Sequence, residues 1–308
     1  MTRLLRSELL RMRSRRVVWV LAIVAALGIV VGVTIGAVNS QRPTEDEIVR
    51  AQQRYERAYQ RCLDGEFFAP EDVPAEFGTV ERFCQVAIDQ SGMVSSNAME
   101  LRDLRGLLES FSTMVILLGV VLGATLVGAD WTTGTYGTLL TWEARRLRAL
   151  LARVIVVALT VFVATAFLQA LFVVAFRVAV QLRGSTALTP ADWLGEVAGV
   201  SFRVSIASVA LAVIAAALAT IGRSTVLAVG VLFGYLVIVE GFLAGIVQDL
   251  DRWLLVRALT VVVVNETGSP LEGAFGGISV DRGRALVLGY VVITVAVAAL
   301  VMRRRDVQ

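Results

Sequence analysis

The sequence predicts an all-α integral membrane protein with six transmembrane helices, and three observations lead to this fold class. Of the 308 residues, 56% are hydrophobic, above the roughly 45–50% of typical soluble domains. The apolar residues stand in six blocks, each long enough to cross a bilayer as a helix of ~17–25 residues. The connections between the blocks alternate between basic and acidic, as the positive-inside rule requires of a multi-pass protein.

Both ends of the chain are basic, which places both termini in the cytoplasm by the positive-inside rule. The arginines concerned are Arg3, Arg6, Arg11, Arg13, Arg15, Arg16, Arg303, Arg304 and Arg305. Within residues 1–16, leucines alternate with these arginines in a pattern typical of an amphipathic helix on the cytoplasmic leaflet. A charge cluster that only anchors the first span would explain the pattern equally well.

The first span is predicted at residues 17–38. Its roughly 22 apolar-dominated positions are enough to cross a ~30 Å hydrocarbon core. A cleaved secretory signal, the alternative, would combine a shorter apolar core with a small-residue cleavage site. We therefore expect a retained transmembrane helix.

Residues 39–110 are expected to form an extracytoplasmic helical cap, because this loop carries fourteen acids against eight arginines. Thr44 and Glu47 match a capping box, and apolar residues then recur at helical spacing as far as Gly65. A second helix is predicted at 79–90, and a third stripe, starting at Leu101, runs into the second span. A flexible linker is the alternative.

The chain has two cysteines, Cys62 and Cys84, one on each of the first two predicted cap helices. An even count in an outward-facing loop favours a disulfide. Such a bond would stabilise the cap by about 3 kcal/mol in the chain-entropy model. Two free thiols remain the alternative.

The remaining part of the chain, 111–308, is predicted to hold five more spans, at 111–129, 154–180, 197–221, 225–247 and 283–302. The acidic segment 248–282 faces outward and contains the apolar run ALTVVVVN, which is too short to span. A short outer helix or a re-entrant element fits this run, because bare apolar backbone at the membrane needs protein cover.

Small residues recur at four-residue spacing in the first two spans, where they permit close helix approach. The glycines are Gly28, Gly32, Gly36, Gly119 and Gly123. The pattern leaves open whether they pack within one subunit or against a second copy.

Two ionisable residues, Arg203 and Glu240, fall inside predicted spans, where an unpaired charge costs several kcal/mol. They lie about 19 residues before and 17 after the tight turn near residue 222, so antiparallel helices bring them to within about 3 Å of the same depth. We therefore predict an intramembrane polar pair near the exit of a transport path. A purely structural pair, or an Arg203 that extends to the outer headgroups, is the alternative.

Two absences exclude whole classes of function. The chain has no histidine, and its 29 basic residues are all arginine. A Walker loop needs lysine for the phosphates, whereas HExxH metal sites, Ser-His-Asp triads and imidazole-ligated haem need histidine. This chain should therefore not hydrolyse ATP by a Walker mechanism.

Residues 128–153, GADWTTGTYGTLLTWEARRLRALLAR, interrupt two apolar blocks with a turn-prone corner and a short basic helix. The order of an acid, Gly-Thr, Leu-Leu-Thr and two later basic residues resembles the first cytoplasmic loop of permease subunits of type 2 ABC transporters. The positions concerned are Asp130, Gly134, Thr135, Leu139, Leu140, Thr141, Arg146 and Arg153. The family commonly has proline where this chain has Glu143. The resemblance extends to the six spans, the basic start and the large first loop.

The resemblance implies that the loop near 130–153 is a coupling helix seated in a groove of a separate ATP-binding subunit. Two copies of that subunit, carrying ATP and Mg, would drive two permease chains, identical or homologous, between inward and outward states. We expect no cofactor in this chain. Coupling to the ATPase subunit is expected to involve Asp130, Gly134, Thr135, Glu143, Arg145 and Arg146.

The predicted function is that of a permease subunit in the cell membrane, in contact with lipid but not nucleic acid, that exports an amphiphilic or drug-like substrate. The alternative is a membrane-anchored sensor or assembly protein whose cap binds a partner. An intramembrane enzyme is disfavoured by the lack of histidine, although an aspartate or serine mechanism stays open.

Overall fold

The structure, a computed structural model, describes most of the chain in two compact units. One unit comprises Met1–Ala26, Leu108–Ala170 and Val197–Gln308, and the other Leu27–Leu107 and Leu171–Glu196. The boundary passes through continuous helices. The described residues are 2–13, 15–41, 44–66, 79–88, 99–132, 134, 146–186, 189, 192–243, 246, 253–264 and 279–304.

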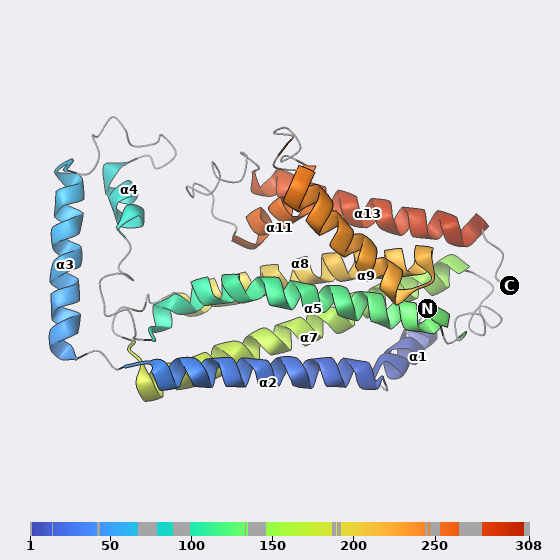
Figure 1. The fold of residues 1–308 in the computed structure, drawn as a ribbon, viewed down its shortest axis with the longest axis horizontal. Helices are drawn as coiled ribbons and strands as arrows, with labels where there is room; N and C mark the ends of the chain where they lie inside the picture. The colour runs from blue at the N-terminus through green and yellow to red at the C-terminus, as the bar shows by residue number, and fades with distance from the viewer. Residues whose placement is uncertain are drawn as a thin grey trace. The chain divides into compact units, whose positions relative to one another are not determined.

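The prediction of six spans is confirmed, since six helices in the described residues are long and apolar enough to cross a membrane. The protein is thus a multi-pass membrane protein (Figure 1). The spans are α2 (Arg16–Asn39), α5 (Leu104–Thr132), α7 (Arg146–Arg183), α8 (Trp193–Gly222), α9 (Thr225–Gly234) with the π-helical η5 (Tyr235–Leu243), and α13 (Val280–Arg304). Each of α5, α7 and α8 begins several residues before its apolar block.

The other elements are short helices, and the described residues form no strand beyond one isolated bridge. They are α1 (Thr2–Arg13), α3 (Glu45–Leu63), α4 (Val80–Ala87), η4 (Leu101–Asp103) and α11 (Leu255–Val264). The apolar run that was predicted to be too short to span therefore forms the ten-residue helix α11. At about 1.5 Å per residue, α11 is only about half as long as a bilayer core is thick.

Helix α8 is the centre of the first unit. Inside its most apolar window 78% of residues are buried, against 11–17% for α2, α9 and α13. Gly119 and Gly123 of α5 face α8 so closely that a Cβ at either position would collide with Ser208 or Ala212. These two glycines therefore pack α5 against α8 within one subunit, and the apolar side chains of the outer helices are left for lipid.

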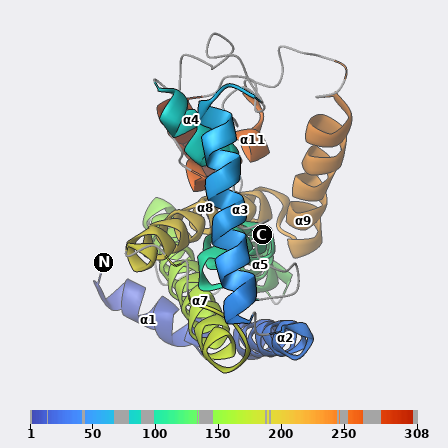
Figure 2. The same ribbon diagram turned by 90° about the vertical axis from the view of Figure 1, so that its left-hand side faces the viewer.

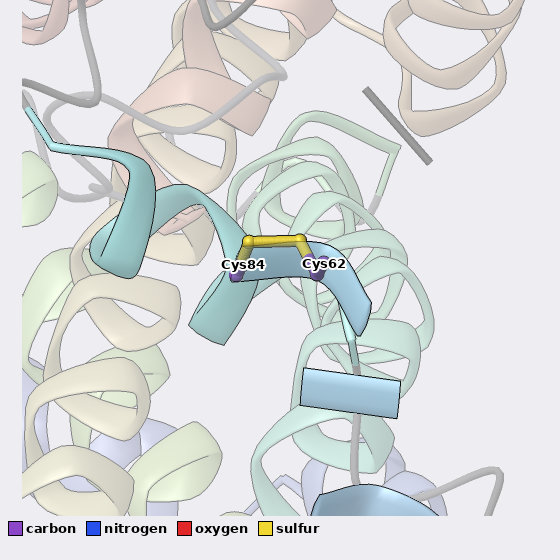
Figure 3. Close-up of a disulfide and its surroundings, with 2 residues drawn as sticks. All are labelled: Cys62 and Cys84. Atoms are coloured by element: carbon purple, nitrogen blue, oxygen red, sulfur yellow. A yellow bond between two sulfur atoms is a disulfide. The ribbon is translucent and has the colours of Figure 1, made fainter. Parts of the chain in front are cut away.

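The second unit contains the disulfide. The bond joins Cys62, in the last turn of α3, to Cys84 of α4 (Figure 3). The capping box at the start of α3 is present: the Glu47 backbone N–H donates to Thr44 Oγ1, and the Thr44 N–H donates to Glu47 Oε2 at 2.8 Å. The bond from the Thr44 N–H, followed by the interaction with the Thr44 side chain, lowers the pKa of the Glu47 carboxyl.

Three chain segments meet at Ser40, just after α2. The Ser40 hydroxyl donates to Arg183 O at the end of α7 and accepts from the Met99 N–H at 2.9 Å. Met99 O accepts from the Ser185 N–H, and Ser185 O accepts from the Leu101 N–H. Beyond this junction α3 runs crosswise to the adjoining end of α2 (Figure 2).

Candidate functional site

Asp130, at the end of α5, is the centre of a buried ion-pair network. Its side chain is only 3% exposed. Oδ1 accepts from Arg15 and, at 3.1 Å, from Arg11, while Oδ2 accepts from Arg153. Arg153, in the third turn of α7, is itself only 1% exposed. One carboxylate thus joins α5 to α7 and to the segment that carries α1.

Glu8 of α1 completes this group. It is 3% exposed and lies 3.8 Å from Arg11 Nη1 and 4.0 Å from Arg153 Nε. The five residues are called the Asp130 cluster below: Glu8, Arg11, Arg15, Asp130 and Arg153. Three arginines face two carboxylates, so every buried charge in the cluster has an opposite charge within 4 Å.

The sequence around α1 explains how its residues reach the cluster. Glu8 and Met12 lie one turn apart and are buried, whereas Leu10 is 60% exposed. Helix α1 therefore turns Glu8 and Met12 toward the other helices and Leu9 and Leu10 away from them. Arg15, in the break between α1 and α2, also donates to the Leu126 carbonyl of α5 at 3.2 Å.

The Asp130 cluster flanks the loop that resembles a coupling helix. Gly134 adopts a φ of +69°, which a residue with a Cβ rarely accepts, and its N–H donates to Trp131 O at 3.3 Å. Arg146 is the first residue of α7, and only its backbone is described. Thr135, Glu143 and Arg145 lie outside the described residues.

Trp131, next to Asp130, extends the site to the remaining helices. The guanidinium of Arg223 lies 5.0 Å from the centre of its ring, and Arg223 sits with φ 53° in the turn between α8 and α9. The indole also packs on a buried group from α7, α8 and α13, namely Leu150, Ala217, Ala298 and Met302. The end of α5 thus contacts residues from α7, α8 and α13 and from the turn between α8 and α9.

The ion pairs of this site attach the ends of α5 and α7 to the segment that carries α1. A buried ion pair that loses one partner costs about 3–5 kcal/mol, because the other charge is left without compensation. The residues of the Asp130 cluster therefore have to move together. Among the described residues, no group of three or more His, Cys, Asp or Glu side chains could hold a metal ion.

A second buried polar network joins α7 to α8 and contains no charge. Gln169 Nε2 donates to Ser205 Oγ at 2.9 Å, to Ser201 O at 3.1 Å and to Thr165 O at 3.3 Å. Gln169 and Ser205 are each 1% exposed. Sequence reasoning considered only ionisable residues inside the spans and so missed this network. A lone amide within a long apolar block is the signal that was available.

The predicted Arg203–Glu240 pair is not among the contacts of the described residues. Arg203 Nε instead donates to Val263 O, in the last turn of α11, at 2.8 Å. Glu240 accepts from the Val256 N–H, in the first turn of α11, at 2.8 and 3.0 Å. The prediction compared only the depths of the two residues in their own helices. It left out α11, whose two ends contact Arg203 and Glu240. Each of the two residues thus contacts a different end of α11, and their pairing with each other stays a prediction.

The structure brings together some of the predicted site residues. Asp130 and Arg153, both in the loop motif, contact each other directly. The pattern of the sequence indicates only that Arg11 and Arg15 set the orientation in the membrane, and it does not single out Glu8. The available signal was Glu8 itself, a single acid within a strongly basic segment. The loop motif also begins with an acid, Asp130.

Comparison with known proteins gives one match. No curated protein sequence and no solved structure matches the chain. A family model described as DUF2705, protein of unknown function, matches residues 82–308, which run from within α4 through α13 and include Asp130 and Arg153. Because this match covers well over half of the chain, the protein belongs to the DUF2705 family.

Proposed function

We propose that this chain is the permease subunit of an ATP-driven exporter of an amphiphilic or drug-like substrate. It works in the cell membrane as one of two permease chains, identical or homologous, on two cytoplasmic ATP-binding subunits. The observation that carries the proposal is the Asp130 cluster. It connects both sides of the loop at residues 133–145 to α1 through buried ion pairs.

The cluster supports coupling because it ties together the two helix ends that flank the loop. A force applied to the loop displaces Asp130 on α5 and Arg153 on α7 together, since separating them exposes a buried charge. Trp131 and Arg223 pass the same displacement to the turn between α8 and α9. A loop built only to connect two spans would need none of these buried charges.

The proposed orientation puts the termini and the loop at 133–145 in the cytoplasm and the α3–α4 cap outside. The arginine-rich ends support it through the positive-inside rule. The Cys62–Cys84 disulfide supports it independently, because disulfides persist in oxidising compartments and are rare in the cytosol. The outward leucines of α1 suit a helix lying on the inner leaflet.

The proposal assigns the ATP chemistry to another polypeptide, and the absence of lysine from the sequence supports this, because a Walker loop needs lysine. On this proposal the partner carries ATP and Mg, and this chain supplies Arg145, Arg146 and Glu143 as polar contacts. Asp130, Gly134 and Thr135 shape the corner that presents them. The alternating access of two such chains would expose a path between them to each side in turn.

The test is purification of the tagged chain in mild detergent, followed by measurement of ATP turnover in lipid nanodiscs. An ATPase subunit with a Walker loop should co-purify, and Arg146→Glu should weaken the complex or lower its substrate-stimulated ATP turnover. Arg304→Glu reverses a charge on the same proposed side of the membrane and should change neither. A folded chain that binds no ATPase subunit refutes the proposal, and a complex indifferent to Arg146→Glu refutes the assigned contact.

A membrane-anchored assembly protein is the second candidate, and the cap is the observation that favours it. A disulfide-linked pair of helices is more than a simple connection between spans requires. In that case deletion of residues 44–90 would abolish binding of the cap's partner, and no ATPase subunit would co-purify with the chain. A permease should lose transport when the loop at 133–145 is altered, whether or not the cap is present.

A further inference from the structure

Helix α11 is held at both ends by side chains from neighbouring elements. Its first N–H groups, on Leu255 and Val256, donate to Tyr235 Oη at 3.2 Å and to Glu240, both from η5. At its other end Val263 O accepts from Arg203 of α8. An anion therefore sits at the positive end of the helix dipole and a cation at the negative end. The two contacts lie about 10 Å apart along the axis.

The π-helical geometry of η5 explains how two of its side chains reach consecutive N–H groups. Tyr235 and Glu240 are five residues apart and would point about 140° away from each other around an α-helix axis. In a π-helix the hydrogen bonds run from residue i to i+5, which stacks residues five apart on one face. Both side chains therefore face the start of α11. Such π segments occur frequently at functional sites.

The third attachment of α11 is its packing on α13. Val261 and Val280 form a buried contact, and a Cβ on Gly283 would lie only 3.1 Å from Ala258 O. Just before α11, Trp253 O accepts from the Tyr290 hydroxyl at 2.9 Å. This side of the helix is apolar and does not respond to pH. The response of α11 to pH therefore depends on its ends.

The charged and titratable groups that face the start of α11 can be assigned one by one. Tyr235 and Tyr290, whose rings lie 6.5 Å apart, present phenol groups, and Arg257 of α11 itself carries a guanidinium. Asp281 of α13 is 93% exposed and pairs with Arg284. Among the described residues, Glu240 is thus the one carboxylate that contacts this helix end.

We propose that Glu240 is a proton-sensitive latch: its carboxylate holds the N-terminal end of α11 against η5, and protonation releases that end. The sign follows from the contact. The ionised form accepts the Val256 N–H with both oxygens and stabilises the helix dipole, so the latch is closed above the pKa of Glu240 and opens as the pH falls through it. The Arg203 contact stays closed, so α11 pivots on its C-terminal end.

The latch gives the protein a way to sense the pH on the side of the membrane that α11 faces. Opening it would expose the side of α11 that is buried in the closed form, including Leu259, which is 4% exposed. This inference does not depend on the proposed transport activity. If that proposal is correct, pH would regulate the step in which the α11 region rearranges.

The experiment uses the full chain in lipid nanodiscs, with Leu259→Cys as a reporter of opening and a polar maleimide as the probe. The native cysteines are in the disulfide and do not react. Thr260→Cys, at a less buried position, corrects for the pH dependence of thiol reactivity. The corrected labelling rate of Leu259→Cys should rise as the pH is lowered. Glu240→Gln should raise the rate about tenfold at neutral pH, equivalent to about 1.4 kcal/mol, and abolish its pH dependence.

Two further variants separate a latch from general destabilisation. Arg203→Met frees the other end, so it should raise labelling but keep the pH dependence. Asp281→Asn removes a carboxylate that does not contact α11 and should change neither. The proposal is overturned by a labelling rate that does not change with pH. It is also overturned if the labelling rate of the Glu240→Gln protein changes with pH as that of the parent does.

Discussion

The Asp130 cluster and the ends of α11 use the same residue types in different ways. In the cluster, side-chain charges bind one another, and Asp130 and Arg153 are almost completely buried. At α11, Glu240 and Arg203 bind backbone groups at opposite ends of one helix. A charge in a membrane protein can thus be balanced by another charge or by a helix end.

This difference has an energetic consequence. Residues that bind each other depend on each other, so the loss of one member leaves the rest unbalanced. Residues that bind separate ends of a helix act independently when those ends are far apart. The first arrangement suits parts that have to move together, and the second suits a helix that can be released at one end.

The largest effect is expected from Asp130→Ala, because it leaves three arginines, of which Arg153 is buried, with Glu8 as the one remaining carboxylate of the cluster. We expect a loss of about 3–5 kcal/mol in the free energy of unfolding. Thermal unfolding in detergent measures it. As a control, Asp281→Ala breaks an exposed pair with Arg284 and should cost less than about 0.5 kcal/mol. Equal losses in the two variants would show that the cluster does not hold the helices together.

The double variant Asp130→Ala with Arg153→Met should be milder than the sum of the single changes. The second substitution removes the charge that the first left uncompensated, so we expect a coupling of about 1–3 kcal/mol. A double-mutant cycle on unfolding free energies measures this coupling. Strict additivity would mean that Asp130 and Arg153 do not form the ion pair described above.

A smaller effect and no coupling are expected for Glu240→Gln and Arg203→Met. Each removes one helix-end contact, worth about 0.3–2 kcal/mol. Because the contacts are about 10 Å apart, the double variant should be additive within about 0.5 kcal/mol. The same unfolding assay applies. A coupling as large as that of the Asp130 cluster would instead support the direct Arg203–Glu240 pair predicted from the sequence.

The smallest effect is expected at the start of α3, where a carboxylate also contacts a helix end but from within the same turn. Thr44→Ala should speed hydrogen exchange of the Glu47 and Ile48 amides, whose N–H groups donate to Thr44. Because the pKa of Glu47 is lowered, its contribution is present above its unfolded pKa and is lost as pH falls through the folded value. Protection that stays constant through that range would contradict this assignment.

Features set by neighbouring residues could be predicted from the sequence. The capping box at Thr44 and Glu47 depends on three-residue spacing, and the six spans depend on the length of apolar blocks. The number and location of the cysteines predicted the disulfide, which the structure contains. The capping box and the apolar blocks are each read within one segment, and the number of cysteines is a single count.

The partners of the buried charges could not be predicted in the same way. Arg11 and Asp130 are 119 positions apart, and their contact requires α1 to reach the end of α5. The depth calculation for Arg203 and Glu240 considered two helices, but a third, α11, takes both charges. The number of residues between two charges does not reveal which other element comes between them.

The sequence by itself determined that the protein spans a membrane with six helices, and it predicts which loops face each side. Only the tertiary structure decided that Asp130 binds three arginines and that Glu240 and Arg203 bind the ends of α11. The physical reason is that apolar length and charge bias act on each segment separately. An ion pair or a helix-end contact instead depends on which helices are neighbours, and packing between distant segments decides that.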